Sequence, residues 1–472
     1  MSKQYYIRSL FFTISCIVCS GCNKLVQVPE PVNTITTSET FSTPANATSA
    51  LINVYSLLSY DQDFLTFSNG AVTLEAGLSA DELNYFKTSA EVLQFQNNAL
   101  QSNNSYFYNR FWSLSYQEIY GANAVIEGIQ SSKTLPTSVK NQLTGEAKFL
   151  RAFCYFYLSN LFGDVPLVTT TAYAKTVLLS RTATSLVYQQ MISDLKDAQS
   201  LLPDDYKISN GERIRANKSA ATALLARVYL YNKNYPNAAS SASDLIANTG
   251  VYALSPLSQV FSANSSEAIL QWQVSNTLYP YATVEGNSII PSNNTNSPIY
   301  YCSTGLLNAF ESGDQRKTTW ISNTVYSGTT YYYPFKYTVR QGSSGDAIPQ
   351  YYMVLRLAEQ YLIRAEAEAN GAAGGDEAAI ADLNIIRNRA NLPPLSVSLT
   401  HTQVIAAIAQ ERRVELFSEW GHRWLDLKRT GQALTVLSQL SYKTALNANQ
   451  LLYPIPLHEI QDDPNLTQNP GY

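Results

Sequence analysis

The sequence predicts a mainly α-helical fold, an α-solenoid of tetratricopeptide-like helix pairs with large irregular, loop-rich insertions. In three separate pairs of segments, small or apolar residues recur at three- and four-residue steps, which is the spacing of one buried helix face. Such pairs bury a continuous core only by stacking on one another. Two long stretches, residues 60–104 and 251–350, lack this periodicity and supply the insertions.

The three helix pairs differ in how clearly the sequence shows their helical spacing. The pair at 219–248 is continuous, and its residues Leu225, Ala226, Ala238 and Ala242 fall at the spacings of two antiparallel helices that approach closely. The other two pairs lie at 142–202, where an insert separates the helices, and at 353–390. Together they predict the scaffold of the protein.

A C-terminal helical region, residues 402–472, carries the most charged segment. A helix is predicted from Gln403 to Trp420, with Arg412 on its buried face and Gly421 at its end. Charged residues recur three or four positions apart within and just after this helix, at Glu411, Glu415, Glu419 and Arg423. A catalytic network is one interpretation. We favour the structural one, in which the charges tie the helix to its neighbours.

The start of the chain predicts export. Residues 1–21 form a signal peptide with basic residues, an apolar run too short to span a bilayer, and small residues before Cys22. Cys22 is the predicted lipidated residue of a lipoprotein, although Cys19 departs from the aliphatic residue usual three positions earlier. An ordinary secretion signal without lipid is the alternative. Residues 22–45, rich in Pro, Thr and Ser, are predicted to be an extended tether.

Composition excludes several functions. Charged residues make up 14% of the chain and the net charge is −4, which does not suit a nucleic-acid-binding protein. With three histidines and no zinc or phosphate-binding motif, the sequence predicts no cofactor and no metal. Cys154 is predicted to be a buried free thiol, and His422 to pack into a helix junction.

Carboxylate doublets are the remaining catalytic candidates. Asp81–Glu82 and Asp462–Asp463 are the visible pairs, and we interpret both as solvated surface. A glycosidase needs two acids that are close in space, which adjacent residues rarely supply. The sequence therefore predicts a protein that is not an enzyme.

Two C-terminal motifs identify a family resemblance. ERRVELFSEWGHRWLDLKRTG, followed by LYPIPLHEIQDDPNLTQNPGY, resembles the C-terminal region of the SusD/RagB family of outer-membrane nutrient-binding lipoproteins. GEAKFLRAFCYFYLSNLFGDVPL and the later helix pairs are similar to further segments of that family. The resemblance implies a single SusD-like domain over residues 46–472 and is weakest in the two insertions.

The resemblance also implies a function. Members sit on the outer face of the outer membrane, capture oligosaccharides or, in some cases, peptides, and deliver them to a SusC-type TonB-dependent transporter. Aromatic rings and hydroxyl groups suit a neutral sugar, so aromatic residues of the insertions are the candidate contacts. These candidates are Tyr85, Phe86, Tyr279, Tyr281, Trp320, Tyr331 and Tyr332. The alternatives are a peptide-binding member, a tetratricopeptide-like scaffold that binds protein, and an all-helical glycoside hydrolase.

Overall fold

The computed structural model describes residues 36–59 and 65–472. The signal peptide, Cys22 and most of the predicted tether lie outside the described residues. The last part of the tether is not extended, because α2 (Thr37–Thr40) and α3 (Pro44–Ser59) begin within it. Phe41, between the two helices, is buried against Gly128, where an added Cβ would lie 2.1 Å from the Phe41 ring. This apolar contact anchors the N-terminal end of the folded part.

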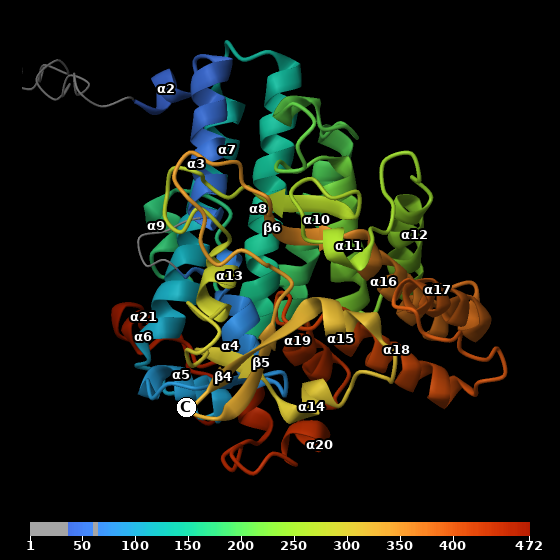
Figure 1. The fold of residues 1–472 in the computed structure, drawn as a ribbon. Helices are drawn as coiled ribbons and strands as arrows, with labels where there is room; N and C mark the ends of the chain where they lie inside the picture. Colours follow the sequence, from blue (N-terminus) through green and yellow to red (C-terminus); the bar gives the residue numbers. More distant parts are fainter. Residues whose placement is uncertain (1–35, 60–64) are drawn as a thin grey trace, which may run out of the picture.

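Long helices form the body of the molecule, as predicted (Figure 1). After α3 they are α7 (Leu114–Ser131), α8 (Thr137–Phe162), α10 (Thr184–Leu201), α11 (Lys218–Tyr231), α12 (Tyr235–Ile246), α16 (Leu357–Ala369), α17 (Gly375–Arg389) and α18 (His401–Glu415). The predicted pairs are α8 with α10, α11 with α12, and α16 with α17. Each pair packs on the next, because α10 contacts α11 and α12 contacts α16.

Short elements fill the connections between the long helices. The helical ones are η1 (Phe67–Asn69), α4 (Ala71–Ser79), α5 (Ala90–Gln96), α6 (Ser105–Phe107), the π-helical turn η2 (Tyr108–Ser113), α9 (Tyr173–Thr176), η3 (Lys207–Ser209), η4 (Leu257–Gln259), α13 (Val284–Ile289), α14 (Thr304–Leu307), α15 (Gln315–Trp320), α19 (His422–Arg429), α20 (Ala433–Leu437), η5 (Ala448–Leu451) and α21 (Leu457–Asp462). Many of them lie in the two predicted insertions, which are therefore less irregular than expected.

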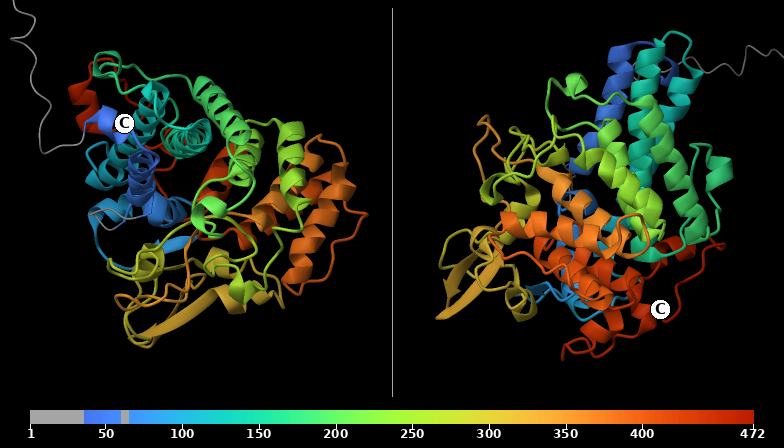
Figure 2. Two further views of the ribbon diagram at one scale, coloured as in Figure 1. Left: turned by 90° about the horizontal axis from the view of Figure 1, so that it is seen from above. Right: turned by 90° about the vertical axis from the view of Figure 1, so that its right-hand side faces the viewer.

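The described strands form three two-stranded antiparallel sheets. They pair β1 (Leu83–Tyr85) with β3 (Tyr300–Cys302), β2 (Ala268–Trp272) with β6 (Tyr352–Arg356), and β4 (Ile321–Tyr326) with β5 (Thr329–Pro334). The β2–β6 sheet is buried along its whole length and contacts α11. The β4–β5 hairpin instead projects from the body (Figure 2).

Helix α4 corrects the expectation for residues 60–104. All nine of its residues are buried, so this stretch contributes to the core. A helix that is covered on every side shows no amphipathic period, which is why the sequence pattern missed it. One of its neighbours is α19, which follows the turn at Gly421.

That turn also shortens the predicted helix 403–420, which ends at Glu415. Trp420 has a positive φ of 49°, and its indole Nε1 donates to the Met353 carbonyl at 2.6 Å. Its backbone N–H donates to Thr73 Oγ1 at 3.0 Å. Gly421 has a φ of 65°, and a Cβ there would lie 2.7 Å from the Cβ of Ala76 in α4. Long-range contacts therefore end the helix early.

The charges of α18 and the turn tie this region to its neighbours, which confirms the structural interpretation. Their partners come from other elements and not from successive turns of one helix. Arg356 donates to Glu267, Glu415 and Glu419 at 2.6–2.8 Å, and all four side chains are buried. The network fixes β6 against the turn that follows α18.

The doublet Asp81–Glu82 is buried, so the prediction of a solvated pair is wrong. Arg423 Nε and Arg413 Nη2 donate to Asp81 at 2.7 and 2.8 Å. Burial raises the pKa of Asp81, but these two guanidinium groups together hold it below its usual value. Burial and the neighbouring Asp81 raise the pKa of Glu82 to about 8. Asp81 therefore compensates two half-buried arginines, while the raised pKa of Glu82 keeps this second carboxyl mostly protonated near neutral pH.

The second doublet is divided between surface and core. The Asp462 side chain is 69% exposed, whereas Asp463 is 8% exposed and accepts from the Asn465 backbone N–H. The solvated interpretation therefore holds for Asp462 and is wrong for Asp463.

Cys154 and His422 have the predicted packing roles. Cys154 is a buried free thiol whose Sγ lies 3.3 Å from Glu118 Oε2. His422 is 4% exposed at the start of α19, where burial lowers its pKa to about 4. Neither side chain reaches an open surface.

Candidate ligand-binding site

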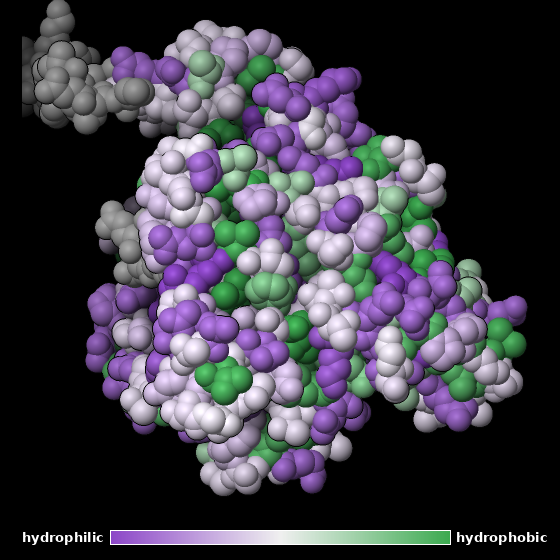
Figure 3. Space-filling model, viewed as in Figure 1, coloured by the Kyte–Doolittle hydropathy of each residue, from purple (hydrophilic) through white to green (hydrophobic). Residues whose placement is uncertain are grey.

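A groove of about 660 Å³ opens beside α3, at the end of the buried β2–β6 sheet. Its walls are α3, the segment 273–284 that follows β2, and the segment 347–352 that enters β6. In Figure 1 the yellow-to-orange loops cross in front of α3 and α8 on this side of the molecule. Apolar and polar residues are interspersed over this face in the space-filling view (Figure 3).

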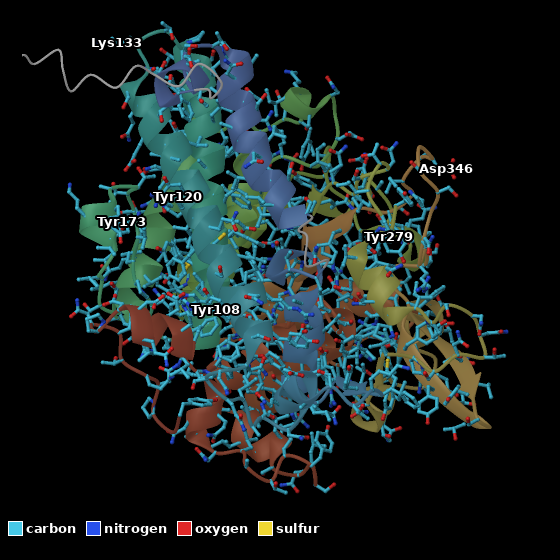
Figure 4. All side chains as sticks on the ribbon, turned by 90° about the vertical axis from the view of Figure 1, so that its left-hand side faces the viewer. Tyr108, Tyr120, Lys133, Tyr173, Tyr279 and Asp346 are labelled. Atoms are coloured by element: carbon cyan, nitrogen blue, oxygen red, sulfur yellow. The ribbon has the colours of Figure 1, made fainter. Side chains whose placement is uncertain are left out.

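Tyr279 stands at the rim of the groove. Its side chain is 45% exposed, and its ring meets Tyr281 edge-on with centroids 6.3 Å apart. The loop is held from behind, since the Gly342 backbone N–H donates to the Pro280 carbonyl at 3.0 Å. Figure 4 shows Tyr279 on the opposite flank from Tyr120 and Tyr173. An exposed ring on a supported loop suits contact with a flat apolar face.

The floor of the groove consists largely of aromatic residues that are held in place by hydrogen bonds. Tyr55 Oη donates to Glu146 at 2.8 Å and Tyr352 Oη donates to Glu285 at 2.8 Å. Burial raises the pKa of both phenols well above the usual value, so both stay protonated. Trp272, also in the floor, packs edge-on against Tyr55 with ring centroids 5.8 Å apart.

The groove is close to electrically neutral. Among the described residues that line it, Arg215 is the one charged side chain, and its guanidinium lies 2.6 Å from Glu146 with both groups buried. None of these lining residues is Asp or Glu. Exposed polar groups come instead from Ser56, Gln273 and Asn276. Hydroxyls, amides and aromatic rings are the groups that bind uncharged, hydroxyl-rich molecules.

The candidate aromatic residues do not form one site. Tyr279 lines the groove, and the ring of Tyr281 packs against the ring of Tyr279. Phe86 and Tyr331 belong to a second cluster, in which the Phe86 ring meets Tyr331 and Tyr326 at 5.3 and 5.6 Å. Tyr85 lies beside that cluster and packs on Tyr300 of β3. A role for this cluster in ligand contact stays a prediction.

Adjacent tyrosines of the β4–β5 hairpin point in opposite directions. Tyr331 faces the body with Tyr333, whereas Tyr332 lies on the other face of β5 and is 42% exposed. Side chains alternate along a strand, so two consecutive residues cannot share one contact surface. Tyr331 and Tyr332 therefore belong to different surfaces of the hairpin, and ligand contact by either one stays a prediction.

Trp320 is not available to a ligand, which corrects its place among the candidates. It is 1% exposed at the end of α15, and its Nε1 donates to the Leu257 carbonyl at 2.9 Å. Phe261 packs edge-on against the indole at 5.7 Å. The preceding Asp314–Arg316 turn gave no indication of this burial because its covering residues come from distant segments.

Sequence reasoning missed Gln273, Asn276 and Tyr351. Tyr351 Oη lies 3.2 Å from Glu212 Oε1 and closes one end of the groove. A signal was present, since Gln273 directly follows β2 and Asn276 comes three residues later, where a buried strand reaches the surface. That boundary marks polar residues placed by a rigid element.

The structure thus has a helical body with an open, neutral groove that carries an exposed tyrosine. Known proteins show which family has this architecture. A model described as "Starch-binding associating with outer membrane" matches residues 33–230, and the SusD family model matches residues 276–472. The chain therefore belongs to the SusD/RagB family. It is similar to the SusD-like protein P2 of Formosa agariphila, with 26% identity over 521 residues that cover 100% of both chains.

Solved structures show the same fold. A SusD superfamily protein from Bacteroides vulgatus superposes with a TM-score of 0.79 at 22% identity, covering 92% of this chain and 100% of the other. A laminarin-binding SusD-like protein gives a TM-score of 0.75 at 27% identity, covering 91% and 99%. In the part of the chain that is described, no helix combines the length and hydrophobicity needed to cross a membrane.

Proposed function

We propose that this protein binds a neutral oligosaccharide in the groove beside α3 as a nutrient-binding protein of the outer membrane. The observation that carries the proposal is the lining, which offers Tyr279 at the rim, amides and hydroxyls around it, and no carboxylate among the described lining residues. The laminarin-binding relative at 27% identity supports a glycan as ligand. The lack of a paired acid at the groove favours binding over hydrolysis.

Delivery and anchoring complete the proposal. The lipidated Cys22 would hold the protein on the outer leaflet at the cell surface, and the captured glycan would pass to a SusC-type TonB-dependent transporter. The family model that describes association with the outer membrane supports the location. Replacing Cys22 with Ala should release the protein from the membrane fraction, while purification from native membranes should recover a TonB-dependent barrel with the unchanged protein. A C22A protein that stays membrane-bound would contradict the anchor.

The groove is tested by calorimetric titration with laminarin, starch fragments and other neutral polysaccharides. We expect Tyr279→Ala to weaken the glycan that binds best by roughly tenfold, because stacking of a ring on a sugar face is lost. Tyr173→Ala is the matched control, since Tyr173 is 75% exposed and lies on the opposite flank (Figure 4). Equal losses in both variants, or binding of peptides and of no glycan, would contradict the proposal. Release of shorter products from the glycan would favour the hydrolase alternative.

A further inference from the structure

A second pocket shares no lining residue with the groove and lies mainly among the C-terminal helices. Its volume is about 730 Å³, and it is walled by α18, α19, the end of α16 and the residues between α11 and α12. These helices gather at the lower right of Figure 1 and face the viewer in the right-hand view of Figure 2. We call it the C-terminal pocket.

The C-terminal pocket is positively charged, unlike the groove. The cationic residues in its lining are Lys233, Arg412, Arg413, Arg423 and Arg429, against Glu366 and Asp426 as the acidic ones. Behind the wall, Asp81 neutralises one more charge through its bonds to Arg413 and Arg423. A local excess of positive charge remains in a chain whose net charge is −4. Such a pocket attracts anions.

Arg412 has hydrogen-bonding capacity left over. Its Nε and Nη2 donate to Asp426 at 2.7 and 3.1 Å, which fixes the plane of the guanidinium. Its Nη1 is buried and has no acceptor among the described residues, and the same holds for Nε of Arg413. Arg412 is 3% exposed. A buried donor without an acceptor is costly, and a carboxylate from a ligand would provide one.

The rest of the wall is apolar or small. Leu427 is buried, Ile405 and Val436 are half-buried, and Ala406 and Ala409 are exposed on α18. A ligand that fits this wall carries an apolar side chain beside its carboxylate. Peptides have that combination, whereas an acidic sugar would need an open aromatic ring. The lining presents little open ring face, because Tyr231 is 8% exposed with Arg429 4.9 Å above its ring, and Tyr235 is half-buried.

We propose that the C-terminal pocket binds an acidic peptide segment of a partner protein, with an Asp or Glu side chain on the Arg412–Arg413 edge and an apolar neighbour against Ile405 and Val436. This site is separate from the glycan groove in both charge and location. It gives the protein a second, protein-directed specificity.

The test uses the intact mature protein and an array of N-acetylated hexapeptide amides. In each pool of peptides one position holds a single chosen residue, and the other positions vary. Pools with fixed Asp or Glu should bind roughly tenfold more strongly than pools with Asn or Gln, and 0.5 M salt should reduce the difference. Ala409→Glu places a negative charge on the exposed wall and should abolish the preference. Gln403→Glu makes the same charge change on the same helix outside the pocket lining and should leave it intact.

A preference that is absent from the wild type, or that survives in Ala409→Glu, would overturn the proposal. Displacement of bound peptide by tetragalacturonate would also overturn it, because an acidic sugar would then be an equal ligand. If Ala409→Glu does not fold, Lys233→Glu takes its place, since Lys233 is exposed at the pocket rim. Glycan titration is independent of this test, so loss of one activity does not imply loss of the other.

Discussion

The groove beside α3 and the turn after α18 use polar side chains in opposite ways. The groove has amides, hydroxyls and phenols around one neutralised arginine. The turn is surrounded by buried arginines and glutamates, of which Arg356 contacts three carboxylates. Only 14% of the residues are charged, and many of those around this turn form buried ion pairs that hold the core together. In the function that we propose, a neutral ligand contacts uncharged groups, which bury with a smaller desolvation cost.

Removing Arg356 should break the charged region most severely. Arg356→Met leaves Glu267, Glu415 and Glu419 buried without their shared cation, so we expect the free energy of unfolding to fall by about 3–5 kcal/mol. Urea denaturation followed by circular dichroism measures it. Lys207→Met, which removes an exposed partner of Asp205, should leave the unfolding free energy unchanged. An Arg356 variant as stable as the wild type would show that the network is not needed for stability.

A pH titration sharpens the comparison, because the pKa of Glu285, behind the groove, and the pKa of Glu415, in the network, are shifted in opposite directions. Burial raises the pKa of Glu285 to about 8, while Arg389, Arg356 and Arg316 overcome the effect of burial and hold the pKa of Glu415 well below its usual value. Between pH 4.5 and pH 8 folded Glu285 binds more protons than unfolded Glu285. Its contribution to stability is therefore full below pH 4.5 and is lost as the pH rises through 8.

Glu285→Gln keeps the neutral shape and removes this titration. Relative to the wild type, its unfolding free energy should rise by roughly 2–4 kcal/mol between pH 5 and pH 8. Thermal or urea unfolding at four pH values measures the difference. Glu459→Gln is a control at a half-buried position whose pKa is also raised, though without a large shift. Parallel pH profiles for wild type and Glu285→Gln would show that Glu285 is ionised in the folded protein.

Gly421 tests the close contact between the turn and α4. Gly421→Ala should lower the unfolding free energy by about 2 kcal/mol, because φ is 65° and the new Cβ would meet Ala76 at 2.7 Å. Gly431→Ala is matched for backbone conformation, with a φ of 73° and no atom within 4 Å of the new Cβ. It should cost about 1 kcal/mol. Equal losses in a denaturation experiment would mean that the contact with α4 adds nothing.

The features that the sequence predicted well depend on the pattern of residues close together in the chain. The helix pairs follow from small and apolar residues at helical spacing, as in Leu225 and Ala238, and the burial of His422 follows from its place at a helix junction. Helix α4 and the early end of α18 were missed because long-range contacts produce them. Trp420 leaves the helix to bond with Met353 and Thr73, which lie 67 and 347 positions away in the chain.

Among the candidate ligand contacts, Tyr279 lies at the rim of the groove and Tyr281 packs on its ring, and contact of either residue with a ligand stays a prediction. Trp320 was misplaced, since nothing near it in the chain shows that Phe261 and Leu257 cover it. Tyr331 and Tyr332 were both named as candidates, although they lie on opposite faces of β5. Faces of a strand follow from its register, which requires knowledge of its partner.

The two faces of β5, with Tyr331 on one and Tyr332 on the other, provide the prediction with the smallest expected change in stability. Tyr331→Ser removes ring contacts with Phe86 and Tyr301, at 5.3 Å in each case, and should lower the unfolding free energy by about 1–2 kcal/mol. Tyr332→Ser removes a ring from the outward face, where Val325 and Thr330 are also exposed, and should change stability by less than about 0.5 kcal/mol. Paired urea denaturation curves decide between the two. If Tyr332→Ser is the more destabilising change, the inner and outer faces of the hairpin are exchanged, and Tyr332 becomes the ring that packs on Phe86.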